Sequence, residues 1–494
     1  MPYTFLTGAT GLLGRYLIRD LTLAGVSVAV LVRPSRRATV QHRVENVMCF
    51  WDQQVGRALP RPVVLEGDIT EPDLGLDARS MRWVAENCDA MLHNAASLSF
   101  QSTGPGSEPW RSNVDGVRHV LDICRNARIR NFHHVSTAYV CGQRQGRILE
   151  SELDVGQSLS NDYEQSKIQA EKMVRSADFI ERLTVFRPAI IVGDSQTSFT
   201  TTYHGFYAPL QAAYTMSGAM PSNATGRSCS VARFPLSGFE TKNLVPVDWV
   251  SAVMSYLITH PEHHGKTYHL TPRHPVTARL LADVLEETAG FYGVRLVGSE
   301  TPMTALTEVE ELFCKLISVY SSYWKDDPTF DASNTLAAAP HLPCPHVDRK
   351  MLWRMAQFAI RVNFTAPRAK PLAPRFDTPQ ALEALLDGVQ EPPEPGDGLL
   401  RLGLRVTGHG GGDWSLWLSE TELQGAELGI HPHCASILEC DVSVLADLRA
   451  GRVPLADAVA RHVHVSGDSV ATPLLARALS ALTESIAAPV AAIN

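Results

Sequence analysis

Residues 4–21 read TFLTGATGLLGRYLIRDL, a short apolar run that ends in glycines before a helical pattern begins. Gly8 allows a sharp turn off a strand, and Gly11 lets a pyrophosphate approach the backbone. Gly14 lets the following helix pack closely on the strand. That helix would point its first N–H groups and its positive end at the phosphates. The order strand, glycine turn, helix predicts a dinucleotide site, and the alternative is an ordinary tight turn.

The composition is that of a globular protein with more than one domain. The chain has 494 residues, of which 45% are hydrophobic and 19% charged, which is too long for one core. A net charge of −8 without a long basic run argues against nucleic acid as a partner. Nine cysteines are scattered without a CxxC pair, so we expect a reducing compartment and neither disulfides nor a metal site.

Two further features of the sequence concern location and metal binding. The chain opens directly on a strand and contains no apolar stretch of about 18 residues, so we expect a cytoplasmic protein without a signal peptide or an integral membrane segment. His260, His263 and His264 lie close together on a proline-interrupted loop. Their spacing is poor for metal ligands, and solvated histidines are the better interpretation.

Apolar runs alternate with helical patterns along the first part of the chain. The runs cover residues 26–33, 61–70, 88–97 and 133–142. Regular alternation of strand and helix predicts an α/β fold, a Rossmann-type doubly wound parallel sheet. Ligands of such a sheet bind beyond the carboxyl ends of its strands.

The end of the second strand indicates which dinucleotide is bound. An acidic residue there would accept from the ribose 2′-OH of NAD, but this chain has Arg33, followed by Arg36 and Arg37. Guanidinium groups suit a 2′-phosphate, so NADPH is the predicted cofactor. The alternative is a solvated basic loop.

The ends of the third and fourth strands offer further contacts with the cofactor. Asp68, followed by Ile69, could accept from the adenine amino group or could instead cap the next turn. The small residues Asn94, Ala95 and Ala96 would leave room for cofactor and substrate. Asn113, on the helical segment 110–132, could support the site from behind or could be ordinary polar surface.

A candidate catalytic group follows the fifth strand. Tyr163 and Lys167 are four residues apart and therefore share one helix face; no other tyrosine of this chain has a lysine at that spacing. An ordinary tyrosine has a pKa near 10, and we expect the lysine ammonium to lower it. Thr137, which with Ser136 ends the strand, can donate to a substrate carbonyl oxygen. The alternative is a surface tyrosine beside a surface lysine.

These motifs together resemble the extended short-chain dehydrogenase/reductase family: TGATGLLG, GDIT, HNAAS, HHVSTAYV and Tyr163-x-x-x-Lys167. Residues 186–207 and 243–271 are similar to the thioester reductase and fatty acyl-CoA reductase branch. The resemblance implies reduction by NADPH of an acyl thioester, carried on coenzyme A or a phosphopantetheinyl carrier protein, to an aldehyde and in some members on to the alcohol. It also implies cofactor contacts from Thr10, Leu12, Leu13, Pro188 and Ile190.

The expected domains follow changes in composition. Residues 1–365 form the reductase domain, with a substrate lobe mainly at 195–240 and 270–365, in which 197–234 would be a mobile lid or merely an irregular loop. Residues 366–398 are a proline-rich linker around one short helix. Residues 399–494 alternate strand-like runs (399–408, 413–424 and 462–468) with helical ones (441–462 and 469–486). That α+β pattern resembles the sterol-carrier-protein-2-like fold and would make a binding or docking module.

Two other functions remain open from the sequence. The same site would serve another extended reductase that acts on a ketone, an alcohol or a sugar nucleotide. A non-catalytic module that binds a nucleotide or a lipid is the third hypothesis.

Overall fold

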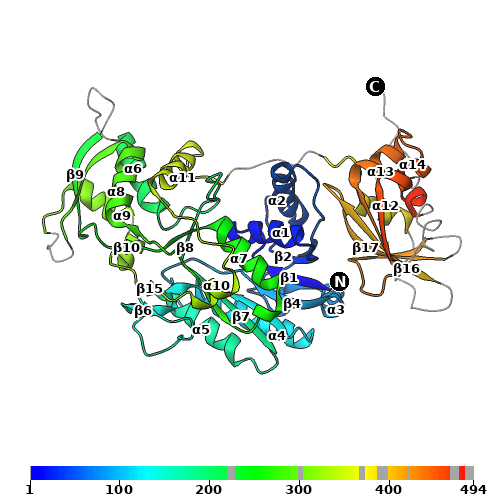
Figure 1. The fold of residues 1–494 in the computed structure, drawn as a ribbon, viewed down its shortest axis with the longest axis horizontal. Helices are drawn as coiled ribbons and strands as arrows, with labels where there is room; N and C mark the ends of the chain where they lie inside the picture. Colours follow the sequence, from blue (N-terminus) through cyan, green and yellow to red (C-terminus); the bar gives the residue numbers. More distant parts are fainter. Residues whose placement is uncertain are drawn as a thin grey trace.

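The computed structural model describes residues 2–219, 228–298, 304–316, 318–366, 373–386, 399–419, 423–467 and 478–483. Its centre is a sheet whose seven described strands run in the order β12-β7-β5-β4-β1-β2-β3 (Figure 1). They span Tyr3–Thr7 (β1), Val28–Val32 (β2), Val63–Glu66 (β3), Cys88–His93 (β4), Asn131–Val135 (β5), Arg182–Pro188 (β7) and Thr267–Leu270 (β12). Every pairing is parallel, which confirms the predicted doubly wound sheet. The strand order reverses between β1 and β4, where such sheets bind their ligands.

Helices cover both faces of this sheet. Successive residues of a strand point to opposite sides, so each strand contributes apolar side chains to both faces. Leu6 packs on one side against α1 (Leu12–Leu23), α2 (Val40–Val55) and α7 (Val247–Thr259). Phe5 packs on the other side against α3 (Ala78–Asn87), α4 (Gly116–Asn126) and α5 (Asp162–Ser176). Both faces are buried, as is usual for parallel sheets.

A lobe with its own apolar core follows the sheet. It contains α6 (Tyr207–Ala219), β9 (Ser228–Phe234), α8 (Ala278–Ala289), β14 (Phe291–Leu296), α9 (Glu308–Leu316) and α11 (Arg349–Arg361). Within the segment 197–234, α6 covers 207–219 and β9 covers 228–234, so the interpretation of the segment as merely an irregular loop was wrong. The mobile lid stays a prediction. The buried face of α6 combines Leu210 and Met216 with the small Ala212 and Ala213, and Tyr214 lies on its exposed side, so its apolar residues show little helical periodicity.

Short elements connect the sheet and the lobe. Three small strand pairs are formed: β6 (Arg147–Ile148) with β15 (Thr329–Phe330), β8 (Ile190–Val192) with β11 (Leu244–Pro246), and β10 (Thr241–Lys242) with β13 (Val276–Thr277). Helix α10 (Ser333–Ala338) packs near β12. The pairs tie the lobe to the carboxyl ends of the central strands.

The C-terminal part has a sheet in the order β18-β17-β16-β19-β20, drawn yellow to red in Figure 1. Its strands are Leu400–Thr407 (β16), Gly412–Leu418 (β17), Leu423–Leu428 (β18), Ser436–Asp441 (β19) and Val463–Gly467 (β20), and its helices are Thr378–Leu385 (α12), Val442–Arg449 (α13) and Leu455–Arg461 (α14). Sequence reasoning missed β19 and did not separate β18 from β17. The expected helix 469–486 is described, as helix, only at 478–483, and much of the expected linker lies outside the described residues. The sterol-carrier-protein-2-like interpretation stays a prediction.

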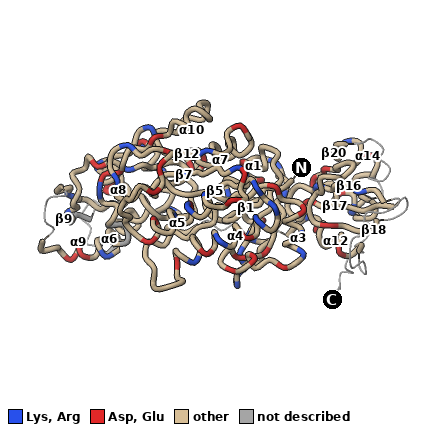
Figure 2. Tube along the Cα trace, turned by 90° about the horizontal axis from the view of Figure 1, so that it is seen from below, with Lys and Arg blue, Asp and Glu red and all other residues tan. Residues whose placement is uncertain are grey.

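This C-terminal sheet packs against the amino end of β1, away from the carboxyl ends of the strands. The Tyr3 hydroxyl donates to Asp413 at 2.9 Å and accepts from the Ile430 N–H at 2.9 Å. Arg405 donates to Asp413 at 2.7 Å and to Ser27 at 3.1 Å. Acidic and basic residues are interspersed along the described part of the trace (Figure 2). Within the described ranges, the helices are all too short or too polar to cross a bilayer.

Candidate active site

A cavity of about 690 Å³ lies at the carboxyl ends of the central strands and extends into the lobe. Segments far apart in the chain bring nearly all the predicted site residues into its wall: Gly8, Thr10, Gly11, Leu12, Leu13, Arg33, Asp68, Ile69, Asn94, Ala95, Ala96, Thr137, Tyr163, Lys167, Pro188 and Ile190. Gly14 and Arg37 lie outside the wall. The wall also contains Arg43 and Gly67, which sequence reasoning did not select.

The glycine loop leaves space where a side chain could not fit. Gly8 has a φ of +73°, and a Cβ there would lie 2.7 Å from the Ala95 nitrogen. A Cβ on Gly14 would lie 2.1 Å from the Gly8 carbonyl oxygen, so this glycine serves helix packing. Gly11 is the N-cap residue of α1. Because glycine has no side chain, no side-chain group caps the N–H groups at the start of this helix. These features fit the phosphates of a bound dinucleotide.

Thr7 and Asn94 join the ends of β1 and β4 at the point where the strand order reverses. The Thr7 hydroxyl accepts from the backbone N–H groups of Asn94 at 3.2 Å and Ala95 at 3.1 Å. The Asn94 amide donates to the Gly8 carbonyl at 3.2 Å. The floor of the cavity is therefore held by a hydrogen-bonded connection between two strands.

Two arginines line the cavity near the end of β2, but one differs from the predicted pair. Arg37 is exposed, and its backbone N–H donates to Ser35. Arg43, in the first turn of α2, donates to the Thr10 hydroxyl at 3.1 Å and to the Arg33 carbonyl. Burial and the charge of Arg33 both lower the pKa of Arg43. Two nearby guanidinium groups are suited to a shared anion.

Asp68 has a local hydrogen bond as well as a place in the cavity wall. One of its oxygens accepts from the Thr70 N–H at 3.0 Å, which is the turn cap that the sequence left open. The other lies 4.0 Å from Arg33. The Asp68 carboxylate thus orders the loop after β3 and faces the arginine pair.

Tyr163 and Thr137 meet across the cavity. Thr137 follows β5, and its hydroxyl also accepts from the Tyr139 N–H at 3.2 Å. Burial raises the pKa of Tyr163 to about 12, and a hydrogen bond with Thr137 acts in the opposite direction. The expectation that Lys167 would lower this pKa was wrong for this structure, because the cost of burying a phenolate dominates. Tyr163 is therefore a neutral hydrogen-bond donor at physiological pH.

Lys167 lies one turn further along α5 and is almost fully buried. Its ammonium donates to the Val135 carbonyl at 2.8 Å. Burial lowers the pKa of Lys167 to about 8, and the carboxylate of Glu171 partly offsets that effect. The ammonium thus lies at the end of β5, one helical turn from Tyr163.

Asn113 lies behind the site and does not line the cavity. Its side-chain oxygen accepts from the Ser97 N–H at 2.8 Å, and its amide donates to the Ser166 hydroxyl at 2.9 Å. Ser166 in turn donates to the Tyr163 carbonyl at 2.8 Å. Asn113 thus connects the loop after β4 to the helix that carries Tyr163.

The part of the cavity inside the lobe is an apolar chamber. Most of its wall is aliphatic or aromatic and comes from α6, β9, α8, β14 and α9: Phe206, Pro209, Ala213, Phe234, Leu281, Ala282, Leu285, Phe291, Val294, Leu296 and Phe313. Glu286 and Lys242 also line it, but Glu286 accepts from the Gly293 N–H at 2.8 Å and Lys242 pairs with Asp327 at 2.8 Å. The chamber is thus suited to an apolar chain.

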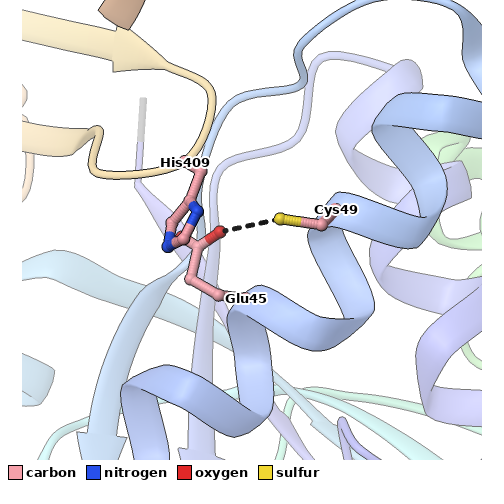
Figure 3. A group of neighbouring side chains, drawn as sticks. All are labelled: Glu45, Cys49 and His409. Carbon is pink, nitrogen blue, oxygen red and sulfur yellow. Dashed lines mark hydrogen bonds between the residues drawn. The ribbon is translucent and has the colours of Figure 1, made fainter. Parts of the chain in front are cut away.

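A group of possible metal ligands lies elsewhere, between α2 and the turn that joins β16 to β17. Among the described residues, Glu45, Cys49 and His409 place one ligand atom each within 4.8 Å of one another (Figure 3). The Glu45 carboxylate already accepts from Arg61 at 3.2 and 3.3 Å. Burial and Glu45 raise the pKa of Cys49 to about 11, which disfavours the thiolate that a metal requires. We assign this group to contact between the two parts of the chain.

Comparison with known proteins places this site in a family. Residues 6–254 match the model of an NAD-binding family described as male sterility protein. The chain belongs to this family. The terminal R domain from the myxalamid PKS-NRPS biosynthetic pathway superposes with a TM-score of 0.59 at 27% identity, over 74% of this chain and 93% of that chain.

Two curated proteins are similar in sequence to this member of the male sterility protein family. The non-canonical nonribosomal peptide synthetase hkm10 of Aspergillus hancockii is 24% identical over 70% of this chain and 35% of its own length. The putative fatty acyl-CoA reductase CG8306 of Drosophila melanogaster is 32% identical over 28% of each chain. The chain therefore spans about a third or less of these relatives.

Proposed function

We propose that the chain reduces an acyl thioester, carried on coenzyme A or on a phosphopantetheinyl carrier protein, to an aldehyde with NADPH. The observation that carries this proposal is the continuity of the cavity. One wall joins the glycine loop, the hydroxyls of Thr137 and Tyr163, and the apolar chamber. The likeness to the myxalamid R domain and to a fatty acyl-CoA reductase supports the same reaction.

The residues of the chain would divide the work as follows. The glycine loop, Arg33 and Arg43 hold the dinucleotide, which supplies a hydride when bound. Thr137 and Tyr163 donate hydrogen bonds to the carbonyl oxygen as it gains negative charge. Tyr163 then gives its proton to that oxygen, and Lys167 holds a ribose hydroxyl. As the carbon–sulfur bond breaks, the hydroxyl proton passes to the leaving sulfur, so a thiol and an aldehyde are released, and Tyr163 regains its proton from solvent. A second reduction would give the alcohol.

Product analysis tests the proposal directly. The purified chain is incubated with NADPH and acyl thioesters of several lengths, on coenzyme A and on a carrier protein, and the aldehyde is trapped with a hydrazine. Thioester-dependent oxidation of NADPH with stoichiometric aldehyde is expected. Turnover of ketones or sugar nucleotides, with no thioester consumed on either carrier, would contradict the proposal.

The lowered pKa of Lys167 predicts a pH dependence. Because the lysine must carry its charge to hold the ribose, kcat/KM should fall as the pH rises through about 8, the pKa given by burial. Tyr163, with a pKa of about 12, stays protonated over this range. Lys167→Arg keeps its charge at high pH, so its residual activity should lack this limb. A limb at the same pH in Lys167→Arg would assign the titration to another group.

A bulky residue in the chamber should shorten the acyl chain that is accepted. Ala282 lies on α8 in the wall of the chamber, and Ala282→Trp should lower kcat/KM for a palmitoyl thioester by about tenfold, with little effect on a butanoyl thioester. Leu312→Trp, at an exposed position on α9, is the matched control. Equal losses for both substrates would show that the acyl chain does not enter the chamber.

A further inference from the structure

We propose that Tyr323 is a positioning residue: it fastens the substrate lobe to the N-terminus of the helix that carries Tyr163 and Lys167. Tyr323 ends the short helical turn η5 (Ser318–Tyr323) of the lobe and lines the cavity. The kinetic test of this inference rests on the proposed function. The structural claim does not: it is that the lobe and α5 share one network of hydrogen bonds.

The Tyr323 hydroxyl contacts the N-terminus of α5. It accepts from the Asn161 amide at 2.9 Å and lies close enough to the Glu164 carboxylate to interact with it electrostatically. Asn161 caps this helix, because its oxygen accepts from the Glu164 N–H at 2.9 Å. Glu164 is 1% exposed, and its carboxylate also accepts from the Ser160 N–H at 2.6 Å. The cap of the catalytic helix is thus completed by a residue from the lobe.

The backbone of Tyr323 is anchored to β10, one of the short strands that connect the sheet and the lobe. Lys242 donates to the Tyr323 carbonyl at 2.7 Å and to the Asp327 carboxylate at 2.8 Å. The Tyr139 hydroxyl, from the segment that follows Thr137, donates to Asp327 at 2.6 Å. The segment 323–327 is therefore bound on one side to β10 and on the other to the turn that follows Thr137.

Ring contacts also connect Tyr323 to Tyr163, through Phe100. The Phe100 ring lies 5.5 Å from the Tyr323 ring and 5.8 Å from the Tyr163 ring, with the latter pair edge to face. All three side chains line the cavity. A substrate in the cavity would therefore touch a wall that runs from the lobe to the catalytic hydroxyl. A shift of Tyr323 would move both the helix cap and the ring that packs on Tyr163.

The test is Tyr323→Phe, which keeps the ring and removes only the hydroxyl. We expect kcat to fall about tenfold and KM for the thioester to rise severalfold, with the Kd for NADPH and the Tm unchanged. Tyr203→Phe is the matched control, because the Tyr203 hydroxyl donates to the Thr365 carbonyl at 3.0 Å and lies outside the cavity wall. In a double-mutant cycle, Glu164→Gln should have little further effect on the Tyr323→Phe enzyme.

A second measurement needs no turnover. Hydrogen exchange at the first amides of α5 should be faster in Tyr323→Phe than in the unmodified chain and unchanged in Tyr203→Phe. If this exchange is faster while no thioester is reduced by the unmodified chain, the fastening holds and the proposed reaction fails. Unchanged exchange, unchanged kinetics, or equal losses in both variants would overturn the role of Tyr323.

Discussion

Tyr163→Phe should lower kcat for thioester reduction by about 10³-fold and leave the affinity for NADPH unchanged. The phenol is the group that can both donate to the developing oxyanion and give up a proton, and each of these roles contributes factors of about 10² or more. Because burial keeps Tyr163 protonated, its loss cannot be rescued by a change of pH. Oxidation of NADPH followed at saturating thioester measures kcat, and fluorescence titration measures cofactor binding.

Two companion variants separate the catalytic role from a structural one. Thr137→Val should lower kcat less, by about 10²-fold, since one of two donors remains. Tyr256→Phe is the control: Tyr256 lies on α7, packs against the rings of His260 and His341, and does not line the cavity. Retention of a tenth of the turnover in Tyr163→Phe, or a parallel loss of NADPH binding, would remove Tyr163 from the chemistry.

The central sheet and much of the cavity wall could be predicted because their signals are local. Gly8, Gly11 and Asn94 follow the carboxyl ends of strands. In a parallel sheet all the carboxyl ends lie at the same edge, so these residues are expected to lie together. The i, i+4 spacing of Tyr163 and Lys167 likewise determines a shared helix face. These patterns need no knowledge of what packs against them.

The parts that could not be predicted depend on distant contacts. Arg43 faces the cavity because Thr39 caps α2, with its hydroxyl accepting from the His42 N–H at 3.2 Å, and so sets where the first helical turn points. The raised pKa of Tyr163 follows from its burial, which the spacing to Lys167 does not report. Tyr323 reaches α5 from about 160 residues away, and nothing in its local sequence indicates that contact.

The second large effect concerns the choice of cofactor: Arg43→Gln should lower kcat/KM for NADPH by about 30-fold or more and leave kcat/KM for NADH nearly unchanged. A charge-assisted contact with a phosphate is worth about 1.5–3 kcal/mol, and NADH lacks the 2′-phosphate. Glutamine is chosen because it can still donate to Thr10, with which Arg43 is bonded at 3.1 Å. The glycine loop should therefore keep its conformation.

Arg37→Ala provides the matched control and decides between the two arginines. Arg37 belongs to the same basic segment of sequence, but it is exposed and lies outside the cavity wall, so its removal should leave both cofactors unaffected. Arg33→Ala should resemble Arg43→Gln in direction, because Arg33 lines the same wall. If Arg37→Ala carried the larger loss, the loop after β2 would have to close over the phosphate. If Arg43→Gln weakened NADPH and NADH equally, Arg43 would act on the glycine loop and not on the 2′-phosphate.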